Sequence, residues 1–125
     1  MTTIVTDPAR MNESFASAFN SRDINRLLGL YETHARLLAG PGVESHIGLE
    51  AIAGALANLL ETPGTMDSQN RLCVEHGDLA LLRADWRITG NDGVILVSGS
   101  STELIRRQPD GRWLYLIDHA AGSLT

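Results

Sequence analysis

Apolar residues recur at helical spacing in three segments of the first half of the chain. Asp7 and Pro8 are typical of a helix start, because the aspartate can accept from free backbone N–H groups and proline loses nothing at the first helical position. The spacing predicts a helix ending near 20–22, a second helix capped by Asp23, and a third beginning near Gly48. The apolar stripes are Met11, Phe15, Ala18 and Phe19; Ile24, Leu27, Leu28 and Tyr31; and Leu49, Ile52, Leu56, Leu59 and Leu60.

Glycine-marked turns divide the second half into four runs that alternate as β-strands do. Helices laid against one concave sheet tend to enclose a pocket, so the pattern predicts an α+β fold with a curved antiparallel sheet and three N-terminal helices on its concave face. The expected strands are 70–76, 79–89, 94–107 and 113–120, and the inward set of the second is Ala80, Leu82, Ala84, Trp86 and Ile88.

Two further segments with glycine predict details of the sheet. Gly40-Pro41-Gly42 is a strong turn signal, so 36–39 and 43–47 are expected to form a short hairpin. The run 94–107 is too long to lie flat. We expect a bend or bulge at Gly99 that curls the sheet into a cone.

Composition and charge exclude several classes of partner. The chain has 125 residues, enough for one domain, and its 43% hydrophobic content includes no run long enough to span a membrane. With a net charge of −5 and no Lys or Arg cluster, nucleic acid is not an expected partner. The N-terminus lacks the basic and apolar regions of a secretory signal, so a cytoplasmic location is expected.

Metal and thiol chemistry are not expected either. Cys73 is the single cysteine, and nothing near it in sequence would lower its pKa. The four histidines show no i, i+4 pair and no His-Glu spacing typical of a metal site. We therefore expect neither a metal nor a cofactor.

The order of these elements resembles the nuclear transport factor 2-like superfamily, which includes steroid delta-isomerase and SnoaL-like polyketide cyclases. The resemblance spans roughly Ala9 to Ala121 and implies a cone-shaped, cystatin-like α+β barrel, one SnoaL-like domain over residues 1–125, and a homodimer. Isomerases, cyclases, dehydratases, hydrolases and non-catalytic domains share this scaffold. The residues that carry the resemblance are Tyr31, Gly48-Leu49-Glu50-Ala51-Ile52, Gly77-Asp78-Leu79-Ala80, Trp86, Asp110-Gly111-Arg112-Trp113 and Asp118-His119.

The steroid isomerases of this superfamily use a carboxylate base and an oxyanion hole built from a tyrosine and a protonated aspartic acid. The resemblance places the tyrosine position at Phe15, the base at about Ala39, and the acid between Ser101 and Glu103. Phe15 cannot donate a hydrogen bond and Ala39 cannot take a proton. Steroid isomerisation by that mechanism is therefore disfavoured.

Asp118 and His119 are the candidate catalytic residues, because polar groups of the final strand can reach the cavity in SnoaL-like proteins. Adjacent strand residues point to opposite faces, so a regular strand sends only one of them inward. One register places Leu114, Leu116 and Asp118 inward beside Ser101 and Glu103. The other places Trp113, Tyr115, Ile117 and His119 inward beside Thr102. The sequence leaves both registers open, with a slight preference for Asp118.

The remaining site predictions concern the cavity wall and the outer face. Ligand contacts are expected from Phe15, Phe19, Tyr31, His46, Trp86, Ser101 and Thr102, while Glu103 is expected to form a solvated charge ladder with Arg106, Arg107 and Arg112. If Trp113, Tyr115 and Ile117 point outward, they form an apolar patch that a second copy would cover.

Two functional hypotheses follow. The first is a pocket protein that binds a small hydrophobic molecule and acts, without cofactor, as an isomerase, cyclase or lyase by proton transfer on a carbonyl compound, with Asp118 or His119 moving the proton. The alternative is a non-catalytic ligand-binding or dimerisation domain of the same fold, which the plain apolar lining favours.

Overall fold

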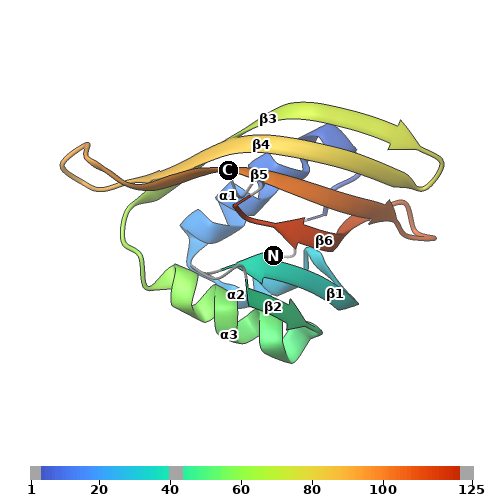
Figure 1. Cartoon of the computed structure of the whole chain (residues 1–125), viewed down its shortest axis with the longest axis horizontal. Coiled ribbons are helices and arrows are strands. Elements are labelled where there is room, and N and C mark those ends of the chain that lie inside the picture. Colours follow the sequence, from blue (N-terminus) through green and yellow to red (C-terminus); the bar gives the residue numbers. More distant parts are fainter. Residues whose placement is uncertain (1–3, 40–43, 122–125) are drawn as a thin grey trace.

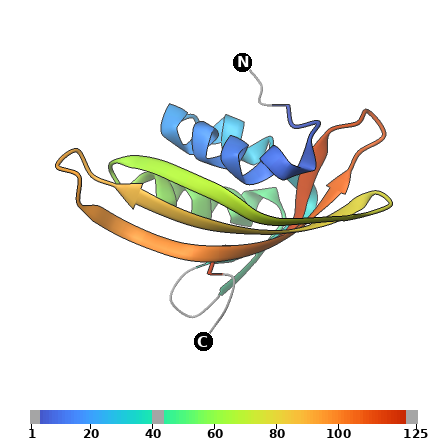
Figure 2. The same ribbon diagram turned by 90° about the horizontal axis from the view of Figure 1, so that it is seen from above.

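One curved sheet carries the helices on its concave side (Figures 1 and 2). The computed structural model describes residues 4–39 and 44–121, and in this part of the chain the sheet has six strands. The elements are η1 (Pro8–Arg10), α1 (Met11–Ser21), α2 (Ile24–Leu28), β1 (Tyr31–Ala39), β2 (Glu44–Ile47), α3 (Leu49–Leu60), β3 (Thr65–His76), β4 (Leu79–Thr89), β5 (Ile95–Arg107) and β6 (Trp113–His119).

The strand order across the sheet is β2-β1-β6-β5-β4-β3. The pairs β2–β1, β6–β5, β5–β4 and β4–β3 are antiparallel, whereas β1 and β6 run parallel. The chain can pair β1 with β6 because the two strands are far apart in sequence, which leaves ample length for the return. The predicted α+β fold with a curved, mostly antiparallel sheet is confirmed.

Side-chain caps begin the first two helical segments where the sequence predicts. Asp7 accepts a hydrogen bond from the Ala9 N–H at 3.0 Å, and Asp23 accepts one from the Asn25 N–H at 2.9 Å. The first turn is a 3₁₀ turn that continues into α1. Phe19 on the predicted stripe is fully buried, so α1 is held by packing against the sheet.

The bounds of α2, β1 and β3 differ from those that the sequence predicts. α2 ends at Leu28, and Tyr31 opens β1 instead of continuing the helical face. The strand expected at 70–76 begins at Thr65, because pairing with β4 stabilises a polar stretch that has little strand propensity of its own. The hairpin of β1 and β2 is present, while the Gly40-Pro41-Gly42 turn lies outside the described residues.

Gly99 does not interrupt the pairing of β5. Its register with Trp86 is unbroken, and the irregularity lies elsewhere in β5, where Ile88 pairs with Val97 and Thr89 pairs with Ile95, so that Leu96 is the extra residue. The predicted bulge at Gly99 is therefore wrong. A Cβ at this position would lie 3.2 Å from Cζ2 of the Trp86 indole, so the glycine makes room for a ring that packs over it.

A bulge in β6 combines parts of both registers that the sequence left open. Ile105 pairs with Tyr115 and Leu104 pairs with Ile117, so Leu116 is an extra residue on β6. The extra residue changes which face the following side chains occupy. Trp113 and Tyr115 are buried, and so is Asp118, whereas Ile117 is exposed on the outer face. The expected outward run of Trp113, Tyr115 and Ile117 is thus reduced to its last member.

The helices of the described segments are short. None of them, within residues 4–39 and 44–121, is long and apolar enough to cross a membrane. The longest is α3, with 12 residues.

Candidate functional site

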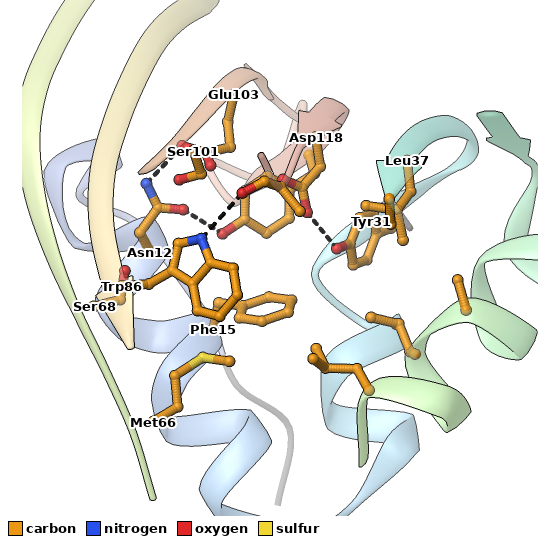
Figure 3. A pocket seen from close by; sticks show the side chains of 16 residues that line it. Asn12, Phe15, Tyr31, Leu37, Met66, Ser68, Trp86, Ser101, Glu103 and Asp118 are labelled. Carbon is orange, nitrogen blue, oxygen red and sulfur yellow. Dashed lines mark hydrogen bonds between the residues drawn. The ribbon is translucent and has the colours of Figure 1, made fainter. Parts of the chain in front are cut away.

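A cavity of about 110 Å³ lies between the helices and the concave face of the sheet (Figure 3). One part of its wall is aliphatic and is formed by side chains of β1, α3 and β3. A polar group of residues occupies the side formed by β5 and β6. The aliphatic part of the wall consists of Leu37, Ala39, Ala55, Leu56, Leu59 and Met66.

Two carboxyl side chains line this cavity. Glu103 is 2% exposed and Asp118 is 7% exposed, and the two residues are direct partners across β5 and β6. Residues that face each other across antiparallel strands have neighbouring side chains on the same face of the sheet. The Leu116 bulge places Tyr115 on this face too, so its ring lines the cavity beside the carboxyls.

Hydrogen bonds hold both carboxyls in place (Figure 3). The Tyr31 hydroxyl donates to Oδ2 of Asp118 at 2.6 Å, and the Asn12 Nδ2 donates to Oε1 of Glu103 at 2.7 Å. The Tyr115 hydroxyl in turn donates to Oδ1 of Asn12 at 2.7 Å, while Asn12 Nδ2 also lies 3.2 Å from Oδ1 of Asn70. Buried polar groups that are bonded in this way have fixed orientations.

Burial sets the protonation of the pair. Desolvation, followed by the negative charge of Asp118, raises the pKa of Glu103 to about 8. Desolvation also raises the pKa of Asp118 to about 6, although the hydrogen bond from Tyr31 opposes the rise. Between these values one carboxyl is ionised and the other holds a proton. The pKa values of Tyr31 and Tyr115 are raised well above their ordinary range by burial first, so both phenols stay neutral.

Four of the predicted contact residues line the cavity together with Asp118. Phe15 comes from α1, Tyr31 from β1, Trp86 from β4 and Ser101 from β5. The Trp86 indole donates to the carbonyl oxygen of Ala120 at 3.0 Å, which holds the ring against the wall (Figure 3).

The other four predicted site residues lie elsewhere. Phe19 is closed inside the core, and His46 is on β2 opposite Leu37. Thr102 and His119 pair with each other on the outer face, because they are the immediate neighbours of the inward Glu103 and Asp118. These four are absent from the cavity wall that the described residues form.

The expected charge ladder of Glu103 with three arginines is not formed. Arg106 binds Glu32, with 2.7 Å between Nε and Oε2. Arg107 binds Asp78 and Arg112 binds Asp110, so each arginine has a carboxylate partner on the surface. Glu103 follows Ser101 at a spacing of two, which is the signal that both side chains share the inward face.

Asn12 is a site residue that sequence reasoning missed. It lies on the first turn of α1, where an asparagine is usually exposed or acts as a cap, yet it is 4% exposed. Its position three residues before Phe15 on the helix was the available signal, since residues at that spacing share a face.

Potential metal ligands do not gather in the described residues, and the pKa of the cysteine thiol is raised. Across residues 4–39 and 44–121, no group of three or more His, Cys, Asp or Glu side chains is placed to hold a metal ion. Burial, and then the charges of Glu75 and Asp7, raise the pKa of the Cys73 thiol, which disfavours a reactive thiolate.

Comparisons with other proteins identify relatives at the level of family and fold. A family model described as "SnoaL-like domain" matches residues 12–116. A candidate calcium/calmodulin-dependent protein kinase type II association domain from Thiobacillus denitrificans superposes with a TM-score of 0.80 at 17% identity, covering 97% of this chain and 98% of that one. A ketosteroid isomerase-like protein from Erwinia carotovora atroseptica gives 0.72 at 23% identity, with 90% of each chain covered.

A third solved structure has a different assignment. It is a candidate dehydratase of the NTF2-like family from Streptomyces avermitilis, which gives a TM-score of 0.72 at 21% identity and covers 92% of each chain. A comparison with curated protein sequences finds no significant match. These structures share the fold of this chain and bear names that belong to unlike functions, so the function must be argued from the site.

Proposed function

Because this chain belongs to the SnoaL-like domain family, whose fold here encloses a cavity with two buried carboxyls, we propose that it binds a small hydrophobic carbonyl compound and transfers a proton within it. The carrying observation is that Glu103 and Asp118 are direct cross-strand partners, are buried, and line the same cavity. Burial raises the pKa of both carboxyls, which favours one ionised and one protonated carboxyl near neutral pH. An ionised carboxylate beside a protonated carboxyl supplies a base and an acid without any cofactor.

The chemistry assigns one role to each carboxyl. The ionised Asp118 removes a proton from the carbon next to the carbonyl, and the electron pair of that C–H bond moves toward the carbonyl oxygen. The protonated Glu103 donates a hydrogen bond to that oxygen as its negative charge develops. In a β,γ-unsaturated carbonyl compound, Asp118 then returns the proton to the γ-carbon as the double bond shifts, which completes an isomerisation. In a compound with a leaving group on the β-carbon, the carbonyl re-forms as that group departs and takes the proton from Asp118, which completes an elimination.

This assignment differs from the steroid isomerase mechanism at two positions. Phe15 and Ala39 line the cavity where the resemblance places the tyrosine and the base, and neither can donate or accept a proton. The proposed base is instead Asp118 on β6, which is oriented by Tyr31. A hydrophobic substrate fits the aliphatic side of the wall, where Leu56 and Met66 are buried.

Exchange of a carbon-bound proton tests the proposal without knowledge of the product. Small ketones and enones incubated in D₂O are followed by NMR for deuterium uptake next to the carbonyl. Catalysed exchange should follow a bell-shaped pH profile with limbs near the pKa values of about 6 and about 8. Asp118→Asn should slow it by roughly 10²–10⁴-fold, the range expected for loss of a positioned base.

Asp85→Asn is the matched control, because Asp85 is a carboxylate of the same sheet that bonds Arg71 on the exposed face. It should leave the exchange rate unchanged. Equal exchange rates for the wild type and Asp118→Asn across the panel would rule out this catalytic role.

We also propose that a second copy of this chain covers the outer face of the sheet. Four apolar residues of neighbouring strands are direct cross-strand partners and form a row on that face. Three of the four are 39% to 50% exposed. A row of this kind is typical of a buried contact between subunits. We call it the convex row; it consists of Val74, Leu81, Leu104 and Ile117.

A further inference from the structure

The cavity carries negative charge that its own wall does not balance. Glu103 and Asp118 line it, and none of the described residues of the wall is a lysine, an arginine or a histidine. A carboxylate removed from water is costly unless an opposite charge or several donors compensate it. The strongest donor that Asp118 receives is the neutral Tyr31 hydroxyl. An incoming positive group would supply the missing compensation.

The arginines of the neighbouring strands do not supply it. Arg36 pairs with Ile117 and Arg83 pairs with Thr102, so both belong to the outer face of the sheet. Arg106 is held by two hydrogen bonds to Glu32 of β1. The cationic side chains that come near β5 and β6 therefore face away from the cavity, on the other side of the sheet.

Aromatic rings enclose the same space from separate elements. Tyr31 and Tyr115 have ring centroids 5.0 Å apart, and Phe15 meets Tyr115 edge to face at 6.1 Å. Trp86 closes a further side of the cavity (Figure 3). The faces of aromatic rings attract cations, with tryptophan the strongest, and rings combined with carboxylates are a recurring way to recognise an ammonium group.

We propose that the natural ligand of this cavity is a small organic cation, a protonated amine with an apolar body. The inference rests on the proposed function, in that the cavity must bind a small molecule. The ammonium group lies between the two carboxyls and the aromatic rings, and the apolar body lies against Leu56, Leu59 and Met66. A ligand with a carboxylate is excluded, because it would meet Asp118 with like charge.

The groups that face the two carboxyls fix how binding depends on pH. Tyr31 on β1 and Tyr115 on β6 remain neutral, because burial raises the pKa of both phenols. Asn12 on α1 and Asn70 on β3 do not titrate. The groups facing the carboxyls therefore do not titrate near neutral pH, and the affinity for a cation should rise as Glu103 and Asp118 lose their protons.

The test compares probes of one shape and different charge. Benzylamine, benzyl alcohol and benzoate, with acetophenone as a neutral carbonyl compound, are titrated into the whole chain by calorimetry or NMR at about pH 7.5 and about pH 5. At the higher pH, benzylamine should bind at least about tenfold more tightly than benzyl alcohol, and benzoate should not bind. At the lower pH the advantage of the amine should shrink toward one.

Two variants complete the comparison. Asp118→Asn keeps the shape of the side chain and removes its charge, so it should remove most of the preference for benzylamine. Asp85→Asn on the outer face is the control and should keep that preference. If Asp118→Asn does not fold, the comparison of benzylamine with benzyl alcohol on the wild type at the two pH values carries the same information, because Asp118 gains its proton between them.

The outcomes separate this inference from the proposed function. Benzyl alcohol or acetophenone binding as tightly as benzylamine at the higher pH would overturn the cation inference and leave proton transfer on a neutral carbonyl compound in place. Failure of all four probes to give saturable binding would overturn both. Tight benzylamine binding without deuterium exchange into any ketone would retain the cation site and remove the catalytic role.

Discussion

At the scale of single residues, burial changes the chemistry of Glu103 more than any neighbouring charge does. Glu32 of β1 is ionised at neutral pH, because the hydrogen bond from Arg106 lowers its pKa. Glu103 is buried and receives a neutral amide donor, so its proton is retained until about pH 8. The same residue type has opposite protonation on the two faces of one sheet.

The raised pKa of Glu103 makes folding stability depend on pH. Between the unfolded value of 4.5 and the folded value of about 8, the folded chain holds more protons than the unfolded chain. The free energy of unfolding should therefore fall as the pH rises through this window, by at most about 5 kcal/mol. Glu103→Gln should flatten the curve, which denaturant unfolding between these pH values measures. A wild-type stability that rises over the same window would contradict the assignment.

Gly99 sets the position of the Trp86 ring that closes the cavity. Gly99→Ala adds a methyl group 3.2 Å from the indole, so the ring must shift toward the cavity or away from Ala120. We expect a changed tryptophan fluorescence spectrum and an affinity for benzylamine lowered by about threefold to tenfold. Gly54→Ala on α3 is the control, because a Cβ there meets nothing within 4 Å. An unchanged spectrum in Gly99→Ala would show that the ring does not depend on this glycine.

At the scale of elements, a strand bulge shapes the site and an arginine connects two helices. The Leu116 bulge brings Tyr115 and Asp118 onto one face, which a regular strand cannot do for residues three apart. Arg22 adopts a left-handed conformation with φ 61° at the end of α1. Its guanidinium donates to the carbonyl oxygens of Leu60 at 3.0 Å and Thr62 at 2.8 Å, which ties α1 to the end of α3.

Two substitutions at Arg22 separate its side chain from its backbone. Arg22→Ala loses the bonds and keeps an unfavourable positive φ, so it should lower the free energy of unfolding by about 1–3 kcal/mol. Arg22→Gly loses the same bonds but tolerates the backbone, so it should be the more stable variant by up to about 1 kcal/mol. Denaturant unfolding measures both. If alanine proves the more stable, the left-handed conformation is not costly at this position.

At the scale of the whole molecule, the sheet divides the protein into a face with the cavity and a face with the convex row. Asp118 belongs to one face, and its neighbour Ile117 belongs to the other. A contact between subunits on the outer face would therefore lie one sheet thickness from the carboxyls. The two proposed surfaces can be altered independently, since alternate side chains of the same strands form them.

Leu81 is the member of the convex row that best tests association. It is 43% exposed and stands between Val74 and Leu104, so Leu81→Glu should place a charge at the centre of the row and yield monomers in sedimentation experiments. Val94→Glu, at a position 56% exposed and outside the row, should leave the dimer intact. A monomeric wild type at micromolar concentration would contradict the proposed dimer.

The sequence by itself determined the elements of this protein, because their signals are local. Caps at Asp7 and Asp23, the alternation from Leu79 to Thr89, and the turn glycines require only neighbouring residues, and the structure confirms them. Phe15, Tyr31, Trp86, Ser101 and Asp118 also line the cavity as expected.

The tertiary structure alone decided the register of β6 and the environment of its carboxyl. Both faces of that strand are apolar, so periodicity could not choose between two registers, and pairing with β5 and β1 introduced the Leu116 bulge instead. Glu103 was expected either beside an inward Asp118 or in a solvated charge ladder, and Asn12 was not expected at all, since burial and hydrogen bonding between residues 91 positions apart leave no mark in either segment. Protonation depends on those distant contacts through desolvation, which no local pattern encodes.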